Sequence, residues 1–168
     1  MSRVILLLSL MLFAGIAFTT NQQDSSSRHD EVSTRGDHVM GFSHDAASHH
    51  FRLFKDGGEI EVSANDPSDK PTIEAIRMHL GHIATMFSAG NFNAPMLIHD
   101  TNPPGVATMT RFKEDVRYLY SSFDRGARIR IFTGNSATTD AVHAFLLFQI
   151  IDHQTGDSPA IVDGLPKS

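Results

Sequence analysis

The chain contains no cysteine, and this absence narrows what the protein can be. Without cysteine no disulfide stabilises the fold, so a hydrophobic core must hold the domain together. A haem attached through Cys-x-x-Cys-His and a lipid anchor on an N-terminal cysteine are excluded as well. Imidazole and thioether groups are then the only soft or borderline metal ligands that the chain offers, and it has ten histidines and seven methionines.

A basic surface and the familiar catalytic motifs are also missing. The chain has 14 lysines and arginines against 19 aspartates and glutamates, with no basic stripe, so we expect no nucleic-acid partner. Phosphate-binding loops, dinucleotide-binding turns, nucleophile elbows and the His-Glu-x-x-His motif do not occur. We therefore expect a binding protein and not an enzyme. Catalysis with His143 or His79 as a base is the weaker alternative.

The N-terminus carries an apolar run from Val4 to Phe18 behind the positive charge of Arg3. A run of this length fits a signal-peptide core and is shorter than the roughly 20 residues that span a bilayer. We expect a signal peptide over residues 1–17 and a periplasmic or secreted protein. An N-terminal membrane anchor is the alternative if the leader is not cleaved, and no other transmembrane domain is expected.

The rest of the chain divides by composition into three parts. Residues 18–39 are polar and serine-rich, which predicts a disordered tether, because such a stretch cannot bury enough apolar surface to order itself. Residues 40–157 have the usual size of one domain. Residues 158–168 contain two prolines and predict a flexible tail.

The domain pattern runs twice through strand, turn, strand and helix. In both copies the second strand alternates apolar with charged residues, glutamates in the first and arginines in the second. The sequence therefore predicts an α+β two-layer sandwich of two ββα repeats, with a four-stranded antiparallel sheet and helices on one face. The expected strands are residues 49–54, 59–63, 116–123 and 128–132, and the expected helices are residues 71–89 and 138–153.

The second predicted helix is apolar on nearly its whole circumference. A helix of this kind is buried on more than one side. It is therefore either the central helix of the domain or a surface that packs on a protein partner or a second copy, giving a homodimer.

The first predicted helix carries His79, His82 and Met86 on one face, beside its apolar stripe. Imidazole with thioether is a ligand set that favours copper, with zinc as the alternative ion. A complete site needs ligands from elsewhere. Two segments offer them, the junction before the domain and the linker between the repeats. Their candidate ligands are Met40, His44, Met96 and His99.

Four short runs resemble a group of uncharacterised exported bacterial proteins. They are His49-His50-Phe51, His79-Leu80-Gly81-His82-Ile83-Ala84, Pro103-Pro104-Gly105-Val106 and the stretch from His143 to Asp157. The resemblance covers residues 40–157 and implies an exported bacterial domain, without any known activity or site residues.

These observations predict a small exported domain that binds a soft or borderline transition metal, copper most of all, for carriage, buffering or sensing. The alternative is a non-catalytic interaction or dimerisation module whose histidines are structural.

Overall fold

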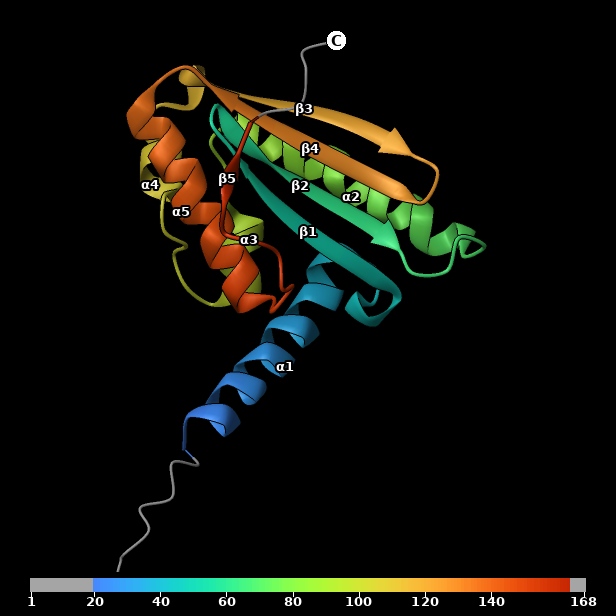
Figure 1. The fold of residues 1–168 in the computed structure, drawn as a ribbon. Coiled ribbons are helices and arrows are strands. Elements are labelled where there is room, and N and C mark those ends of the chain that lie inside the picture. The colour runs from blue at the N-terminus through green and yellow to red at the C-terminus, as the bar shows by residue number, and fades with distance from the viewer. Residues whose placement is uncertain (1–19, 164–168) are drawn as a thin grey trace, which may run out of the picture.

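The computed structural model describes residues 20–163, and the predicted signal peptide lies outside them (Figure 1). Within that range no helix is both long enough and apolar enough to cross a membrane. The helices are α1 (Thr20–Met40), α2 (Lys70–Ser88), α3 (Asn93–His99), α4 (Val106–Arg111) and α5 (Ser136–Asp152), with 3-10 turns at His44–Ala46 and Lys113–Asp115. The strands are β1 (Ala47–Phe54), β2 (Gly57–Ala64), β3 (Val116–Phe123), β4 (Gly126–Thr133) and β5 (Ile161–Val162).

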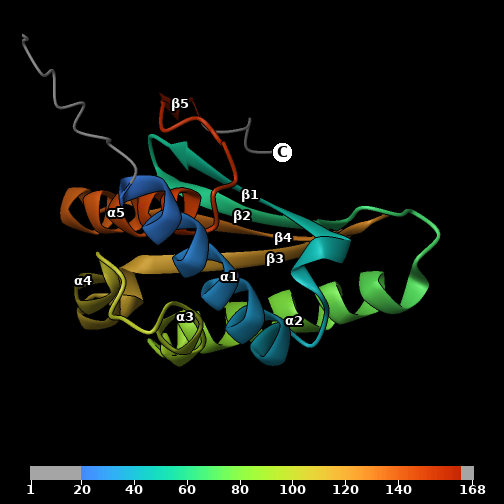
Figure 2. The same cartoon turned by 90° about the horizontal axis from the view of Figure 1, so that it is seen from below.

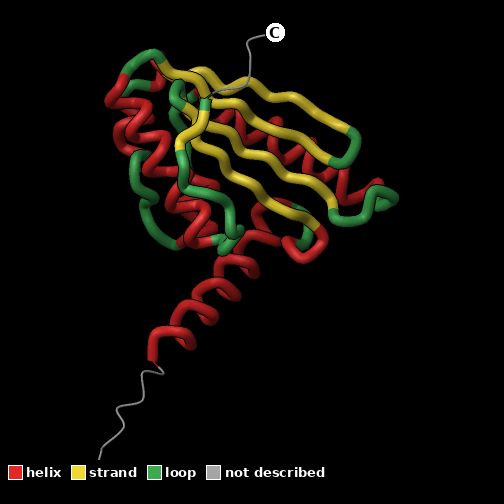
Figure 3. The backbone as a smooth tube through the Cα atoms, viewed as in Figure 1, coloured by secondary structure: helices red, strands yellow, loops and turns green. Residues whose placement is uncertain are grey.

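One five-stranded sheet forms the centre of this α+β fold, with the strand order β3-β4-β2-β1-β5 (Figures 1 and 3). The predicted α+β class is confirmed. The first four strands pair antiparallel, as two hairpins joined through β2 and β4. The prediction of four strands is wrong by one, because β5 adds a parallel pairing at the edge of β1.

The fifth strand was missed because its pairing is too short to leave a periodic pattern. The chain turns back along β1 after α5, and the Asp157 carboxylate accepts a hydrogen bond from the Phe51 amide at 2.8 Å. Further on, the Val162 carbonyl accepts one from the Lys55 amide at 3.1 Å. Residues 161–162, within the predicted flexible tail, therefore cover part of the edge of β1, which protects that part from pairing with other chains.

The sheet buries its apolar side chains under α2 and α5, which lie on the same face. Phe87 of α2 meets Phe145 of α5 edge to face, with ring centroids 5.9 Å apart. Ile60, Ile129 and Ile131 project from the strands into the same core and are buried. This is the face that the alternation of apolar and charged residues in β2 and β4 predicts.

Charged side chains of opposite sign line the other face of the sheet. The strand register pairs Glu59 with Arg130 and Glu61 with Arg128. The Glu59 side chain is only 2 % exposed, and its carboxylate is paired with Arg52 of β1 at 2.7 Å. The charges therefore support one register, because a slip by one residue would turn the apolar set outward.

Local signals set the two long helices as the sequence predicts. The Asp69 side chain caps α2 by accepting from the Thr72 amide at 3.1 Å. Gly90, with a φ of 76°, follows its end. α5 begins two residues earlier than expected, because the Asn135 side chain caps it by accepting from the Ala137 amide at 3.0 Å.

The stretch predicted as a disordered tether is helical, as α1 (Figure 2). Its apolar contact with the domain is narrow. Val32, Gly36 and Met40 follow one another at a spacing of four residues, and all three are buried. The segment is so polar that its composition does not reveal an apolar stripe of three residues. The helix therefore depends more on packing against the domain than on its own helix propensity.

Partners within the chain surround α5. The helix packs on β1, β2 and β4 and against α4 and α1. The ring Nε2 of its His143 lies 2.8 Å from the Phe54 carbonyl and 3.0 Å from the Gly57 carbonyl, which makes it a satisfied core histidine. The apolar circumference of α5 thus no longer requires a second copy, and the homodimer stays a prediction.

The double-proline linker ends in a close backbone contact that only glycine allows. Gly105 has a φ of 84°, and a Cβ atom there would lie 2.0 Å from the Ala141 carbonyl oxygen of α5. We expect Gly105→Ala to lower the unfolding free energy by about 2 kcal/mol or more. Gly134→Ala, in open space, is the matched control. Equal urea midpoints for the two variants would contradict this account.

Candidate functional site

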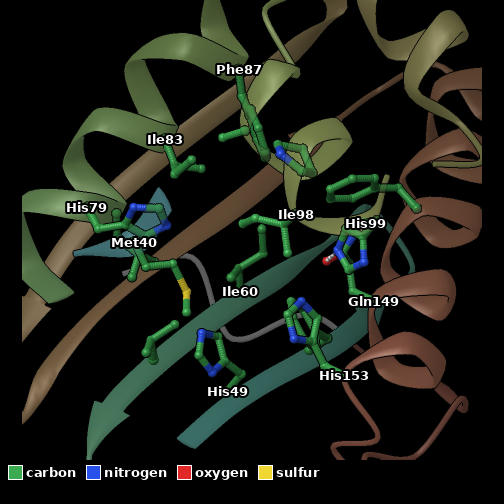
Figure 4. A pocket seen from close by; sticks show the side chains of 16 residues that line it. Met40, His49, Ile60, His79, Ile83, Phe87, Ile98, His99, Gln149 and His153 are labelled. Atoms are coloured by element: carbon green, nitrogen blue, oxygen red, sulfur yellow. Dashed lines mark hydrogen bonds between the residues drawn. The ribbon is translucent and has the colours of Figure 1, made fainter. Parts of the chain in front are cut away.

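A mainly apolar cavity of about 70 Å³ lies between the sheet, α2, α3 and α5, beneath the end of α1 (Figure 4). We call it the inner pocket. Its walls are mostly aliphatic and aromatic, and few polar or sulfur-bearing side chains reach it. Those side chains are Met40, His49, His79, His99, Gln149 and His153. Polar groups converging in an apolar pocket are the usual mark of a binding site.

Strand parity and helix docking bring three of these groups together. His49 shares the inward face of β1 with Phe51, and His79 projects from α2. The buried Phe42 ring stacks on His49 at 6.3 Å and meets His79 edge-on at 5.9 Å. In Figure 4 the sulfur of Met40 projects into the space between these two imidazoles. The arrangement gathers one thioether and two imidazoles from three separate elements.

Burial keeps these imidazoles neutral. It lowers the pKa of His49 to about 4, and the neighbouring His79, His44 and His50 add to the effect. Burial, with the nearby His82, likewise lowers the pKa of His79 to about 4. A neutral imidazole has a free lone pair on one ring nitrogen, so at neutral pH it can bind a metal ion without first losing a proton.

His153 directly follows α5 and lines both the inner pocket and a neighbouring one. Its ring stacks on His49, with centroids 5.4 Å apart and planes 8° from parallel. Lone pairs of an imidazole lie in the ring plane, so two rings stacked in this way cannot aim them at one point. Burial holds the pKa of His153 well below its ordinary value, and the nearby His49 and His99 lower it further.

His99 is fully buried and belongs to a polar junction. Its Nδ1 lies 2.6 Å from a carboxylate oxygen of Asp152, and its Nε2 lies 2.9 Å from Oε1 of Gln149. Arg28 of α1 donates to the same Asp152 carboxylate at 2.6 Å. Because both ring nitrogens already have partners, His99 orients the surrounding helices and is not a free ligand in this arrangement.

The residues predicted to form the site separate into two groups. Met40, His79 and His99 line the inner pocket, and His44 lines a neighbouring one. The other three do not line either pocket. His82 points to solvent, Met86 packs against the core, and Met96 is 38 % exposed in α3. Met86 faces much as His79 does, but it lies two turns, about 10 Å, further along the axis.

The inner pocket also contains three residues that were not among the predicted ligands, namely His49, Gln149 and His153. Strand alternation placed His49 on the inward face, but that alone does not distinguish a site member from a core histidine. His153 and Gln149 carry no local signal, because what matters is where the end of α5 meets β1 and α3. Among residues 20–163 no three His, Asp or Glu side chains are grouped to hold a metal ion.

Comparisons with known proteins suggest no function, so a function has to be inferred from the geometry of the inner pocket. No protein family, no curated protein and no solved structure matches the chain at a significant level.

The lowered pKa values predict a loss of stability in mild acid. The unfolded chain takes up protons on His49 and His79 near the ordinary pKa of 6.5, whereas the folded chain takes them up only near about 4. Their neutral forms are therefore fully compatible with folding above about pH 6.5. As the pH falls toward about 4.5, each should lower the unfolding free energy by about 2 kcal/mol.

Urea unfolding across this pH range measures the effect, because variants separate it from the titration of other groups. His49→Phe and His79→Phe should each flatten the pH dependence, while Met78→Ala, at an exposed and non-titrating residue of α2, should leave it unchanged. A dependence of the same slope in all four proteins would show that the two imidazoles are not buried in neutral form.

Proposed function

We propose that the protein binds copper(I) in the inner pocket, through Met40, His49 and His79, as an exported carrier, buffer or sensor of the ion. The single observation that carries the proposal is that Met40, His49 and His79 line the same pocket, with the Met40 sulfur between the two imidazoles (Figure 4). Thioether sulfur selects copper(I) among the common ions, and imidazole suits it as well. With no cysteine in the chain, thioether and imidazole are the soft and borderline ligands that the protein has for such an ion.

Copper(I) suits the pocket better than zinc does. Structural zinc takes four ligands in a closed tetrahedron, usually thiolates, imidazoles or carboxylates. No three His, Asp or Glu side chains among the described residues are grouped for it. A softer ion can use the Met40 thioether in place of a third nitrogen or oxygen. The proposed role is binding and release, and no nucleophile or paired carboxylate lines the inner pocket to suggest turnover.

Competition for copper(I) against a chromophoric chelator such as bicinchoninate, without oxygen, tests the assignment. We expect one equivalent to bind the full chain. His79→Ala and Met40→Leu should each weaken binding by more than about tenfold, since even loss of a supporting group costs that much at a metal site. His82→Ala, three residues along the same helix but exposed, should bind as the wild type does.

X-ray absorption of the copper-loaded protein gives a second readout, because copper–sulfur scattering should disappear in Met40→Leu. Absence of copper(I) binding by the wild type, or equal losses in His79→Ala and His82→Ala, would overturn the assignment. If the wild type bound zinc more tightly than copper(I), and if Met40→Leu did not change zinc binding, zinc would replace copper as the proposed ion.

The affinity for copper(I) should also be nearly independent of pH between about pH 7.5 and 5.5. Protons compete with metal ions for ordinary histidines in this range, but burial lowers the pKa of both His49 and His79 to about 4. The same competition assay, repeated across the range, measures this. An affinity that falls steadily below about pH 6.5 would indicate that copper(I) binds to groups other than His49 and His79.

A further inference from the structure

One edge of the sheet is the strand β3, and no segment of residues 20–163 pairs with its outer side (Figures 1 and 3). Its pairing with β4 runs without a bulge along all eight residues of the strand. The strand contains no proline and one charged residue, Arg117. Proteins usually protect such an edge with prolines, charges, bulges or a covering segment. The chain covers part of β1 with β5 in this way, but it leaves β3 open.

Large apolar side chains are exposed on both faces of this strand. Leu119 is 55 % exposed on the face that carries the charged residues, and Tyr120 is 40 % exposed on the face that α2 covers. Their neighbours Ser121 and Ser122 are exposed as well, so the middle of β3 is in contact with water along its free edge. Apolar side chains gathered at an unpaired edge are typical of a surface that a partner covers.

A groove of about 340 Å³ lies beside this edge, between α2 and β3. We call it the edge groove. Small residues of α2 and two tyrosines of β3 line it. These residues are Gly81, Ala84, Thr85, Ser88, Tyr118 and Tyr120.

The edge groove contains a polar group that needs a partner. Tyr118 is 9 % exposed, and its hydroxyl is buried without a hydrogen bond to any of the residues that the structure describes. A buried hydroxyl left without a partner costs free energy. A group that enters the edge groove and bonds to this hydroxyl would remove that cost, so the groove favours an occupant.

We propose that β3 pairs antiparallel with β3 of a second copy, about a two-fold axis perpendicular to the sheet, so that two sheets become one. A contact of this kind uses the same edge of both copies, and the assembly therefore closes at a dimer. The surface is separate from α5, the helix on which the sequence predicted a homodimer. The inference does not depend on the proposed copper site.

Charge selects the register of this pairing. When Tyr120 lies opposite Tyr120 of the second copy, Asp115 before β3 lies opposite Arg125 after it, at both ends of the contact. Both residues are exposed in the single chain. A slip by two residues brings either Lys113 or Arg117 toward Arg125 instead, and like charges at opposed positions are destabilising. A slip by one residue turns the wrong face of the second copy toward α2.

The same register brings a side chain to the edge groove. Tyr120 of the second copy then lies on the face that α2 covers, directly opposite the Tyr120 that lines the groove. The small side chains of α2 leave space for this ring. Its hydroxyl is a group that can bond to the buried hydroxyl of Tyr118, so pairing of the strands and filling of the edge groove occur together.

Sedimentation velocity of the full chain at increasing concentration, without added metal, measures the association. We expect a monomer and dimer in reversible equilibrium. Arg125→Asp places like charges opposite each other at both ends of the contact and should raise the Kd of the dimer by at least about tenfold. The double variant Asp115→Arg/Arg125→Asp restores opposite charges and is the matched control. Its Kd should return to within about threefold of the wild type.

The absence of cysteine from the chain allows a direct test of the register. Directly opposed Cα atoms of an antiparallel pair are about 4.5 to 5.5 Å apart, a distance that a disulfide spans. Tyr120→Cys should therefore form a disulfide-linked dimer under mild oxidation. In Leu119→Cys the two cysteines are diagonal neighbours about 7 to 8 Å apart, so this variant should stay largely unlinked.

Three outcomes would overturn the proposal. The wild type could stay monomeric at every concentration. A wild-type dimer with the same Kd in Arg125→Asp would lie on another face, such as α5. Equal disulfide formation in Leu119→Cys and Tyr120→Cys would show that the register is wrong. Because no copper is added, none of these results decides whether the inner pocket binds the ion. Circular dichroism of each variant confirms that the comparison is between folded proteins.

Discussion

The pairing of the buried Asp152 carboxylate is the constraint on which the arrangement of the site depends. A buried charge must have partners, and Asp152, at the end of α5, finds them in Arg28 of α1 and His99 of α3. The same α3 terminus offers two carbonyls without helical partners. Arg28 lies 3.5 Å from the His99 carbonyl, and Arg35, two turns further along α1, donates to the Ile98 carbonyl at 2.8 Å. Three helices thus meet at one polar junction.

That junction determines where α1 lies. This helix contributes side chains to the inner pocket and to the neighbouring one. With Arg28 and Arg35 held, the apolar stripe of α1 faces the domain, and its last residue, Met40, covers the inner pocket. His29 of the same helix lines the neighbouring pocket, which His44 also lines. A helix too polar to be stable alone therefore becomes ordered by a few buried contacts, and the thioether reaches the imidazoles only through this docking.

Local patterns predicted the frame of the domain, and long-range contacts decided the rest. Alternation in β2 and β4, the Asp69 cap and the glycine after α2 were enough to place the four long strands and the two long helices. α1 and β5 were not predicted. The apolar stripe of α1 has too few residues, and the pairing of β5 is too short, to give a detectable periodic pattern in the sequence. For the site, helix spacing predicted that His79 and His82 face the same way, but only packing decides that one is covered by Phe42 while the other stays in water.

The neutral imidazoles connect stability and binding through one physical cause. Burial under Phe42 and Met40 lowers the pKa values of His49 and His79, so that both rings have free lone pairs at neutral pH. The loss of hydration that penalises the protonated rings lowers the stability of the fold in acid, and the same loss leaves the neutral rings able to donate to a metal ion at neutral pH.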